Sequence, residues 1–552
     1  DNTILNIALP TIQRDLNADA SQLLWAVDSY ILVFAALLFT WGVLGDKYGR
    51  KRILTIGLIT FALASALCAF ATSPEQLILF RGLMGIGGAA VLPVTLAVIT
   101  VVFPPHERGK AIGMWAGAVG GAVALGPVLG GLLLENPQWT SWLTNNDWGG
   151  VFLINVPIVI VGLVGIFMVV PETKNPHPQR LDIPGLIISF IGLVLFVYGI
   201  IHASSERTFL TPSVLIPMAL GALVLAGFVI AEARSDHRSF DVTLFKNRGY
   251  TVSLTVVTLA FFAMNGITFT LPFFLQTLRG YSTLTAGLCF LPFAIGQILA
   301  APRSAGMVNR FGYKVVMAGG MAIVTLALLV LSFALHLDTP LWLILLVFFF
   351  FGFGMGNVMA PASTVMQNVL PLARAGAGSA VQNTVRQVGG ALGVAVIGTL
   401  LANQYAKNLA PSLDSLPAQF PSEAKDAMSN SIIATVEVLQ RAVGQGLPAS
   451  VAETVKNGAF TAYLDASHVT TLVSAGLALV AALILWFALP QITPPQKGVH
   501  APAGRPLATE GEGHAHLTDA HSRAEADDAA GELEDSYARE AAEEYQPEPD
   551  KA

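Results

Sequence analysis

Three ionisable residues stand in stretches of the sequence that are otherwise apolar. Asp1 precedes "NTILNIALP", Asp28 lies in "WAVDSY", and Arg81 lies in "LILFRGLMG". An ionisable group inside a membrane span is costly unless it is paired or hydrated, so each residue is a candidate functional site. Burial raises the pKa of a carboxylate and a nearby cation lowers it, so an acid and a guanidinium at one depth can form a proton site. A static buried ion pair between Asp28 and Arg81 is the alternative.

The composition indicates which elements must hold these groups. The chain has 552 residues, of which 54% are hydrophobic and 12% are charged, whereas soluble domains carry about 25% charged residues. Thirteen apolar runs lie between residues 23 and 489, and about 20 helical residues cross a bilayer. The runs lack the alternation of a membrane β-barrel. The sequence therefore predicts an all-α integral membrane protein.

Basic residues fix the orientation of the predicted spans. The segment "GDKYGRKR" (45–52) follows the span at 23–45, and alternate loops beyond it are also rich in Lys and Arg. Such loops face the cytoplasm. The span at 23–45 then runs inward, and residues 1–15 rise toward its outer end, which places Asp1 near mid-membrane. We therefore expect a first span that lacks its inner half here, fourteen spans in the complete protein, and a cytoplasmic C-terminal tail.

An internal repeat suggests the domain organisation. "GVLGDKYGRKR" (42–52) and "GMVNRFGYK" (306–314) each end a span with glycines, an aromatic residue and basic residues. Two six-span repeats around a central site are typical of a secondary transporter. The predicted parts are a six-helix bundle (1–170), an inserted pair of spans with flanking cytoplasmic loops (171–249), a second six-helix bundle (250–489), and an acidic, disordered tail (490–552). The second bundle includes an extracytoplasmic loop at 403–466, which holds a short amphipathic helix.

Asp46 and Arg50 lie at the cytoplasmic edge of the membrane, next to Gly42 and Gly49. They are either charges that only set the topology or parts of a cytoplasmic latch. In a latch, Asp46 lies near a helix N-terminus or an arginine of a neighbouring helix, and the glycines permit a tight turn. Such a contact would hold one access state of a transporter.

The fifth span reads "GMWAGAVGGAVALGPVLGGLLLE". Glycines let membrane helices approach closely, and proline disrupts the hydrogen-bond ladder of a helix. The segment containing Gly126, Pro127, Gly130 and Gly131 therefore predicts a packed seam that bends or seals, although ordinary close packing is the alternative.

Few polar groups are available to line a central cavity. The spans between 250 and 402 contain Arg386 but no acid, and aromatic residues are plentiful. Aromatic faces suit a flat cationic compound through stacking and cation–π contact. The candidate lining residues are Asn6, Tyr30, Asn265, Phe269, Gln297 and Asn357.

These motifs together resemble the fourteen-span drug:proton antiporter family of the major facilitator superfamily, which includes exporters of quaternary ammonium compounds. The matching segments are "DNTILNIALP", "GVLGDKYGRKR", "RGLMGIGGAA", in which Met84 replaces a frequent glutamine, "ALGPVLGGLLLE" and "RLDIPG". The resemblance covers about 1–402 and 467–489. It implies a major facilitator fold of two six-helix bundles plus two inserted spans. It also implies Asp1 and Asp28 as proton or cation sites, assisted by Arg81, and a monomer in a bacterial cytoplasmic membrane.

The resemblance implies export of small hydrophobic or cationic drugs in exchange for protons. Acidic residues are missing from the late spans, which argues against export of divalent cations. The alternatives are a proton-linked exporter of an endogenous metabolite, antibiotic, lipid or siderophore, an importer, and a membrane sensor or enzyme. The sequence lacks the GxxxxGK[ST] motif of ATP-driven pumps. We expect no catalytic residues, no metal, no cofactor besides the coupling proton, and no nucleic-acid partner.

Overall fold

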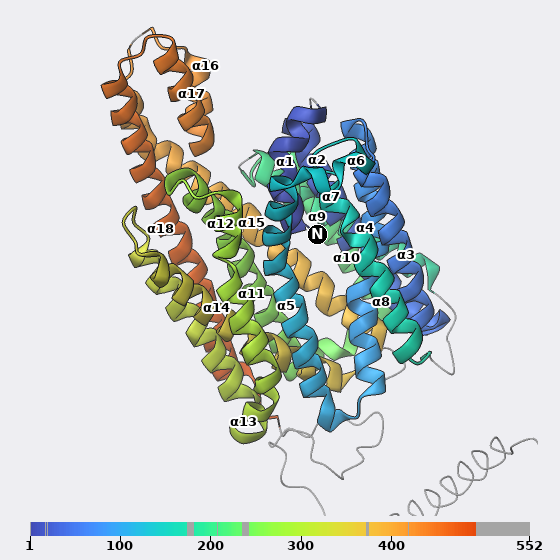
Figure 1. Cartoon of the computed structure of the whole chain (residues 1–552). Helices are drawn as coiled ribbons and strands as arrows, with labels where there is room; N and C mark the ends of the chain where they lie inside the picture. Colours follow the sequence, from blue (N-terminus) through green and yellow to red (C-terminus); the bar gives the residue numbers. More distant parts are fainter. Residues whose placement is uncertain are drawn as a thin grey trace, which may run out of the picture. The chain divides into compact units, whose positions relative to one another are not determined.

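The computed structural model describes residues 2–16, 18, 20–173, 182–206, 208–234, 242–370, 375–417 and 419–492. Every regular element in these ranges is helical, which confirms the all-α prediction (Figure 1). Asp1 and almost all of the predicted tail lie outside the described residues. The helices are α1 Asn2–Leu16, α2 Ala20–Tyr48, α3 Arg50–Ala69, α4 Pro74–Val102, α5 Pro105–Glu135, η1 Pro137–Trp139, α6 Ser141–Thr144, α7 Gly150–Leu153, α8 Asn155–Val169, α9 Ile183–Glu206, α10 Pro212–Arg234, η2 Val242–Lys246, α11 Arg248–Phe273, η3 Phe274–Leu278, α12 Thr283–Leu288, α13 Leu291–Ala334, α14 Leu341–Val369, α15 Ala375–Leu413, α16 Ser422–Asn430, α17 Ile432–Gly444 and α18 Ala449–Ala488.

Eleven segments of the described chain are long and apolar enough to span a membrane. One of them, Leu284–Ala334, holds 51 residues and is interrupted at Gly312, whose φ of 80° and ψ of 161° are not helical. Helix α13 within this segment therefore consists of two helices that meet at Gly312, which is the aromatic-flanked glycine of the repeat at 306–314. The count of fourteen spans stays a prediction.

Two groups of helices pack against each other, where α15 contacts α2 and α4 and where α5 contacts α13 and α14. Helices α2, α3 and α4 contact one another, α3 also contacts α8, and α5 contacts α1 and α4. Helices α11, α13, α14, α15 and α18 form the other group. We call these groups the N-terminal and C-terminal bundles. Helix α5 packs along α13, and α15 packs along α2, so both contacts join the bundles.

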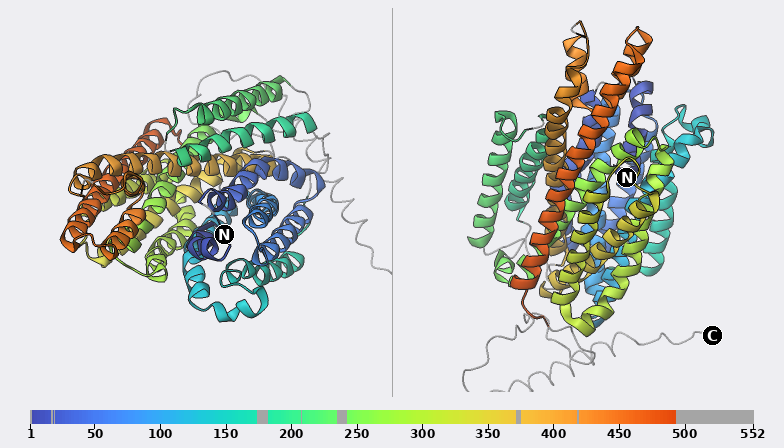
Figure 2. Two further views of the ribbon diagram at one scale, coloured as in Figure 1. Left: turned by 90° about the horizontal axis from the view of Figure 1, so that it is seen from above. Right: turned by 90° about the vertical axis from the view of Figure 1, so that its left-hand side faces the viewer.

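Helices α9 and α10 pack against each other beside the junction of the two bundles. Helix α9 contacts both α2 and α15, and Figure 2 shows the pair lying along the outside of these helices. Trp25 of α2 stacks on Tyr198 of α9, with 6.0 Å between the ring centroids. These two helices lie within the segment 171–249 that the sequence predicts as an insertion, and they flank the junction from one side.

The outer surface of α8 is apolar. Val161, Met168 and Val169 are 72%, 80% and 78% exposed, respectively. Exposing such residues to water would be unfavourable, and a hydrocarbon environment removes that cost. The exposed face of α8 therefore matches the lipid-facing surface of a membrane helix.

The predicted loop at 403–466 is largely helical. Helix α15 continues to Leu413, α18 begins at Ala449, and the hairpin of α16 and α17 joins them (Figure 1). The predicted amphipathic helix corresponds to α17. The parts of α15 and α18 in this segment pack against each other, since the rings of Tyr405 and Tyr463 lie 6.3 Å apart in an edge contact.

Candidate functional site

Arg81 is fully buried within the N-terminal bundle. Its Nε donates a hydrogen bond to the carbonyl oxygen of Ala26 at 3.0 Å, and its guanidinium lies 4.5 Å from the centre of the Tyr30 ring. Phe152 is the next ring, at 6.0 Å. The guanidinium is thus held between α4 and α2 by a carbonyl and by aromatic faces.

Asp28 does not pair with Arg81, which corrects the alternative of a static ion pair. Among the described residues, no hydrogen bond or ion pair engages the Asp28 carboxylate. The reason is the direction of the side chain rather than its depth. A helix turns by about 100° per residue, so Ala26 and Tyr30 share one face of α2 while Asp28, midway between them, lies on the opposite side.

Asp28 lies instead on the face of α2 that contacts α15 further along the helix. Positions 28, 35 and 42 are seven residues apart, and each step rotates the side chain by only about 20°. Gly42 packs on α15 so closely that a Cβ at this position would lie 2.5 Å from the carbonyl oxygen of Gly376. The partly exposed carboxylate of Asp28 therefore belongs to the side of α2 that faces the junction of the bundles.

Asp46 contacts the N-terminus of α15. Its Oδ1 accepts the backbone N–H of Gly376 at 3.0 Å, and its Oδ2 accepts that of Ala377, also at 3.0 Å. Arg50 donates to the same carboxylate. The first N–H groups of a helix lack partners within the helix, and the positive end of the helix dipole favours an anion. We call this contact the cytoplasmic latch, and its four residues are Asp46, Arg50, Gly376 and Ala377.

Two further hydrogen bonds join the bundles near the basic end of the spans. Thr100 Oγ1 donates to Gln367 Oε1 at 3.2 Å, and Arg108 Nη1 donates to Asn368 Oδ1 at 3.2 Å. Nothing in the local sequence of Arg108 indicates this partner, which lies 260 positions away. All hydrogen bonds between described residues of the two bundles lie from mid-membrane to this end.

The glycines of α5 face the C-terminal bundle. A Cβ on Gly113 would lie 2.5 Å from the carbonyl oxygen of Ala301. Gly120 faces the side chain of Gln297, and Gly131 lies against Leu284. Gly130 instead faces Ile4 of α1. We call the row Gly113, Gly117, Gly120, Gly121 and Gly131 the glycine seam. The helix passes through Gly126 and Pro127 as one element.

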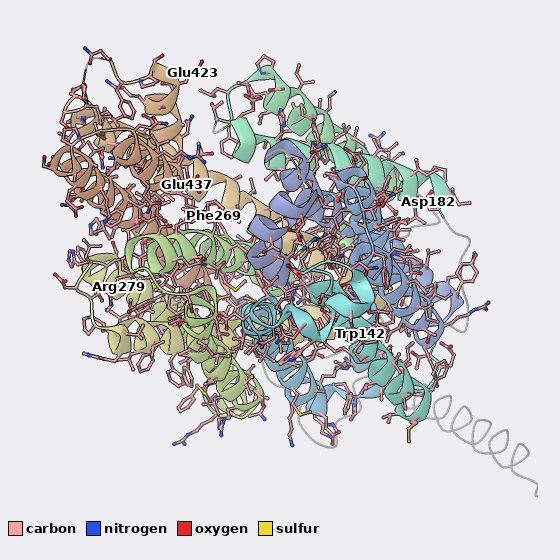
Figure 3. The ribbon with its side chains drawn as sticks, turned by 45° about the horizontal axis from the view of Figure 1, so that its top comes forward. Trp142, Asp182, Phe269, Arg279, Glu423 and Glu437 are labelled. Carbon is pink, nitrogen blue, oxygen red and sulfur yellow. The ribbon has the colours of Figure 1, made fainter. Side chains whose placement is uncertain are left out.

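The predicted cavity residues lie in different surroundings. Gln297 is buried and its Nε2 lies 3.5 Å from the carbonyl oxygen of Ala116, at the seam. Asn265 donates to Phe261 O at 3.0 Å within α11. Phe269, labelled in Figure 3, packs against Gly398 of α15.

Asn357 is buried inside the C-terminal bundle, where its Cβ faces Gly320. The ring of Tyr30 packs against the Arg81 guanidinium. The side chains of Asn6 and Pro127 lie outside the described residues, as does Asp1. No group of three or more His, Cys, Asp or Glu side chains that could hold a metal gathers in the described part of the chain.

The sequence model of the Major Facilitator Superfamily matches residues 1–394 of this chain. The multidrug efflux pump LfrA of Mycolicibacterium smegmatis is 33% identical over 486 residues, which cover 88% of this chain and 92% of LfrA. The tetracenomycin C resistance and export protein of Streptomyces glaucescens is 29% identical, with 88% of each chain covered. The structure of the proton:xylose symporter XylE aligns with a TM-score of 0.53 at 15% identity, covering 89% of this chain and 92% of XylE.

Proposed function

Since this chain belongs to the Major Facilitator Superfamily, a family of membrane transporters, we propose that it exports small hydrophobic or cationic compounds in exchange for protons. The family assignment makes it a transporter rather than an enzyme. Similarity to multidrug and antibiotic efflux proteins supports the direction and the substrate class. We place the protein in a bacterial cytoplasmic membrane on the same ground.

The observation that carries proton coupling is the position of Asp28. Its carboxylate lies within a membrane span, on the face directed toward the junction, without an ion-pair partner among the described residues. A carboxylate inside a membrane is a candidate proton or cation site. Protonated Asp28 is neutral, and deprotonated Asp28 can attract a cationic substrate.

The contacts at the cytoplasmic end supply the conformational part of the proposal. Hydrogen bonds there join the bundles, so this state is closed toward the cytoplasm. Opening to the cytoplasm requires the cytoplasmic latch to break, and the carbonyl-lined contacts of Gly42 and Gly376 to separate. We propose that a proton bound to Asp28 from outside favours one of these two states and that a substrate bound from inside favours the other. A ligand shifts a population only through its differential affinity for the two states.

Ethidium uptake into inside-out vesicles under an imposed proton gradient tests the proposal. We expect gradient-driven uptake by the wild type and its loss in Asp28→Asn at equal expression. Glu135→Gln is the matched control, because it neutralises an exposed carboxylate at the outer end of α5 and should leave uptake unchanged. Undiminished uptake by Asp28→Asn would overturn the assignment of this carboxylate.

A dedicated exporter of an endogenous product is the second candidate. The similarity to the tetracenomycin C resistance and export protein favours it, because that protein is named for one compound. A wild type that fails to transport ethidium, rhodamine 123 and methyl viologen under the same gradient would support this candidate over a multidrug exporter.

A further inference from the structure

Arg386 is a buried cation that the proton-coupled mechanism does not use. It lies on α15 and is only 8% exposed. Its guanidinium lies 4.7 Å from the centre of the Phe261 ring and 6.0 Å from that of Trp115. No hydrogen bond or ion pair to a described residue engages it, and its Nε is buried without a partner.

Aromatic rings satisfy such a cation only in part. Cation–π contact offsets some of the lost hydration, but the guanidinium has five N–H donors that require acceptors. A buried charge that lacks a partner is strongly unfavourable. The site therefore has unused capacity to donate hydrogen bonds to an anion.

Arg386 lies where both bundles contribute. It is 11 residues from the start of α15, or about 17 Å along the helix at 1.5 Å per residue, and this depth is near the middle of a hydrocarbon core of about 30 Å. Trp115 comes from α5 and Phe261 from α11. Both rings are partly exposed, and the three side chains meet at the contact between the two bundles.

Neighbouring groups fix this arrangement. The indole Nε1 of Trp115 donates to Thr95 Oγ1 at 3.2 Å, which holds the ring from α4. Asn383 lies three residues before Arg386, on the same face of α15. Its Oδ1 is buried and lacks a hydrogen-bond partner among the described residues, so this face of α15 holds a second unsatisfied polar atom.

We propose that Arg386, with Trp115 and Phe261, forms a subsite that binds the carboxylate of an aromatic organic anion or zwitterion. The planar fork of the guanidinium matches a carboxylate, and the two rings provide an apolar surface for the aromatic part of the ligand. The inference extends the substrate class of the proposed export function to molecules that carry an acid. An inorganic anion such as chloride has the same charge as a carboxylate, but it has no aromatic part to pack against the two rings.

Two xanthene dyes test the proposal. Fluorescein carries a carboxylate and is anionic, whereas rhodamine 123 shares its ring system and is cationic. Binding of each dye to the purified full chain in nanodiscs is measured by fluorescence anisotropy, first in chloride and then in gluconate buffer. We expect saturable fluorescein binding by the wild type in both buffers. Absence of such binding overturns the proposal whether or not the protein exports drugs, because no transport step is involved. Chloride binding at Arg386 without fluorescein binding also overturns it.

Variants then assign the binding to Arg386. Loss of a hydrogen bond to a charged group corresponds to roughly tenfold or more in affinity. We expect Arg386→Gln to weaken fluorescein binding by at least about tenfold and to leave rhodamine 123 within about twofold. Arg303→Gln is the control, since it removes an exposed arginine that donates to Leu299 O within α13.

Arg386→Lys keeps the positive charge and guards against misfolding of the glutamine variant. It should retain rhodamine 123 binding and part of the fluorescein binding, because a lysine lacks the planar fork. An equal loss of both dyes in Arg386→Lys would show that Arg386 has a structural role and would overturn the subsite. Uptake of both dyes into inside-out vesicles distinguishes this result from failure of the export proposal, which would abolish uptake while leaving binding intact.

Discussion

The Tyr30 ring determines how Arg81 is held at the outer half of the N-terminal bundle. The guanidinium lies 4.5 Å from the ring centre, and the hydrogen bond to Ala26 O fixes its direction. A desolvated cation–π contact contributes about 2 kcal/mol. We therefore expect Tyr30→Leu to lower the stability of the purified protein by about 1–2 kcal/mol, measured as a shift of its thermal unfolding in detergent.

Tyr30→Phe is the matched control for this contact. It keeps the ring and removes only the hydroxyl, which forms no recorded hydrogen bond among the described residues. It should unfold within about 0.5 kcal/mol of the wild type. A destabilisation by Tyr30→Phe equal to that of Tyr30→Leu would show that the hydroxyl, rather than the ring, holds Arg81.

For individual residues, the sequence predicts the depth of a side chain in the membrane better than the direction in which the side chain points. It predicts that Asp28 and Arg81 lie at similar depths, and the bond from Arg81 to Ala26 agrees with this. Their pairing depends on rotation about α2, which no residue type in "WAVDSY" indicates. Likewise, Arg386 is visible as a charge in a span, but its aromatic partners come from two other helices. Such partners depend on how the helices pack, so they require the structure. The functional roles of Asp28, Arg81 and the predicted cavity residues stay predictions.

The cytoplasmic latch joins the end of α2 to the start of α15. Asp46→Asn removes the negative charge and one of the two acceptors for the α15 N–H groups. Hydrogen bonds to a charged group contribute about 1.5–3 kcal/mol, so we expect a roughly 10- to 100-fold increase in the population open to the cytoplasm.

Thiol labelling measures this shift. Ser379 is fully buried one turn into α15, so Ser379→Cys reports opening in a background in which Cys68 and Cys289 are alanine. A membrane-impermeant maleimide added to inside-out vesicles should label this cysteine faster in Asp46→Asn. Lys47→Gln changes a neighbouring charge outside the latch and should not alter the rate. Equal labelling of Asp46→Asn and wild type would contradict the role of the latch.

The glycine seam allows a matched comparison within one helix. A Cβ on Gly113 would lie 2.5 Å from Ala301 O and 2.9 Å from Pro302 Cα, whereas a Cβ on Gly117 would lie 3.4 Å from Ile298 Cα. Overpacking costs about 1–3 kcal/mol. Gly113→Ala should therefore lower the thermal stability and ethidium uptake, and Gly117→Ala should leave both nearly unchanged. Equal effects of the two substitutions would show that close approach at Gly113 is not required.

At the scale of elements, apolar runs and glycine patterns were informative. They predict the helical spans and a close-packed fifth span, whereas the insertion between two repeats stays a prediction. The segment 403–466 was different, because its polar residues are typical of a loop. Its helices are stabilised by packing between α15 and α18, as the contact of Tyr405 with Tyr463 shows. Hydropathy measures suitability for lipid, so it does not reveal a helix that continues beyond the membrane.

Two separate contacts close the proposed cytoplasmic end of the described helices, and we expect both to stabilise the same closed state. The latch lies on α2 and α15, whereas the bond of Arg108 to Asn368 joins α5 to α14. If both favour the same closed state, their free energies add, because sites without shared partners act independently. We expect Asn368→Ala to raise labelling of Ser379→Cys by a few-fold, and the Asp46→Asn/Asn368→Ala double variant to show the product of the two single effects.

The control for this last prediction is Asn136→Ala. It removes an amide whose Nδ2 donates to Leu132 O within the outer end of α5, so it changes no contact between the bundles and should leave labelling unchanged. A double variant labelled no faster than Asp46→Asn alone, at rates well below the limit set by an unfolded control, would show that the α5–α14 contact opens separately. The cytoplasmic end would then consist of two local gates rather than one equilibrium between two bundle arrangements.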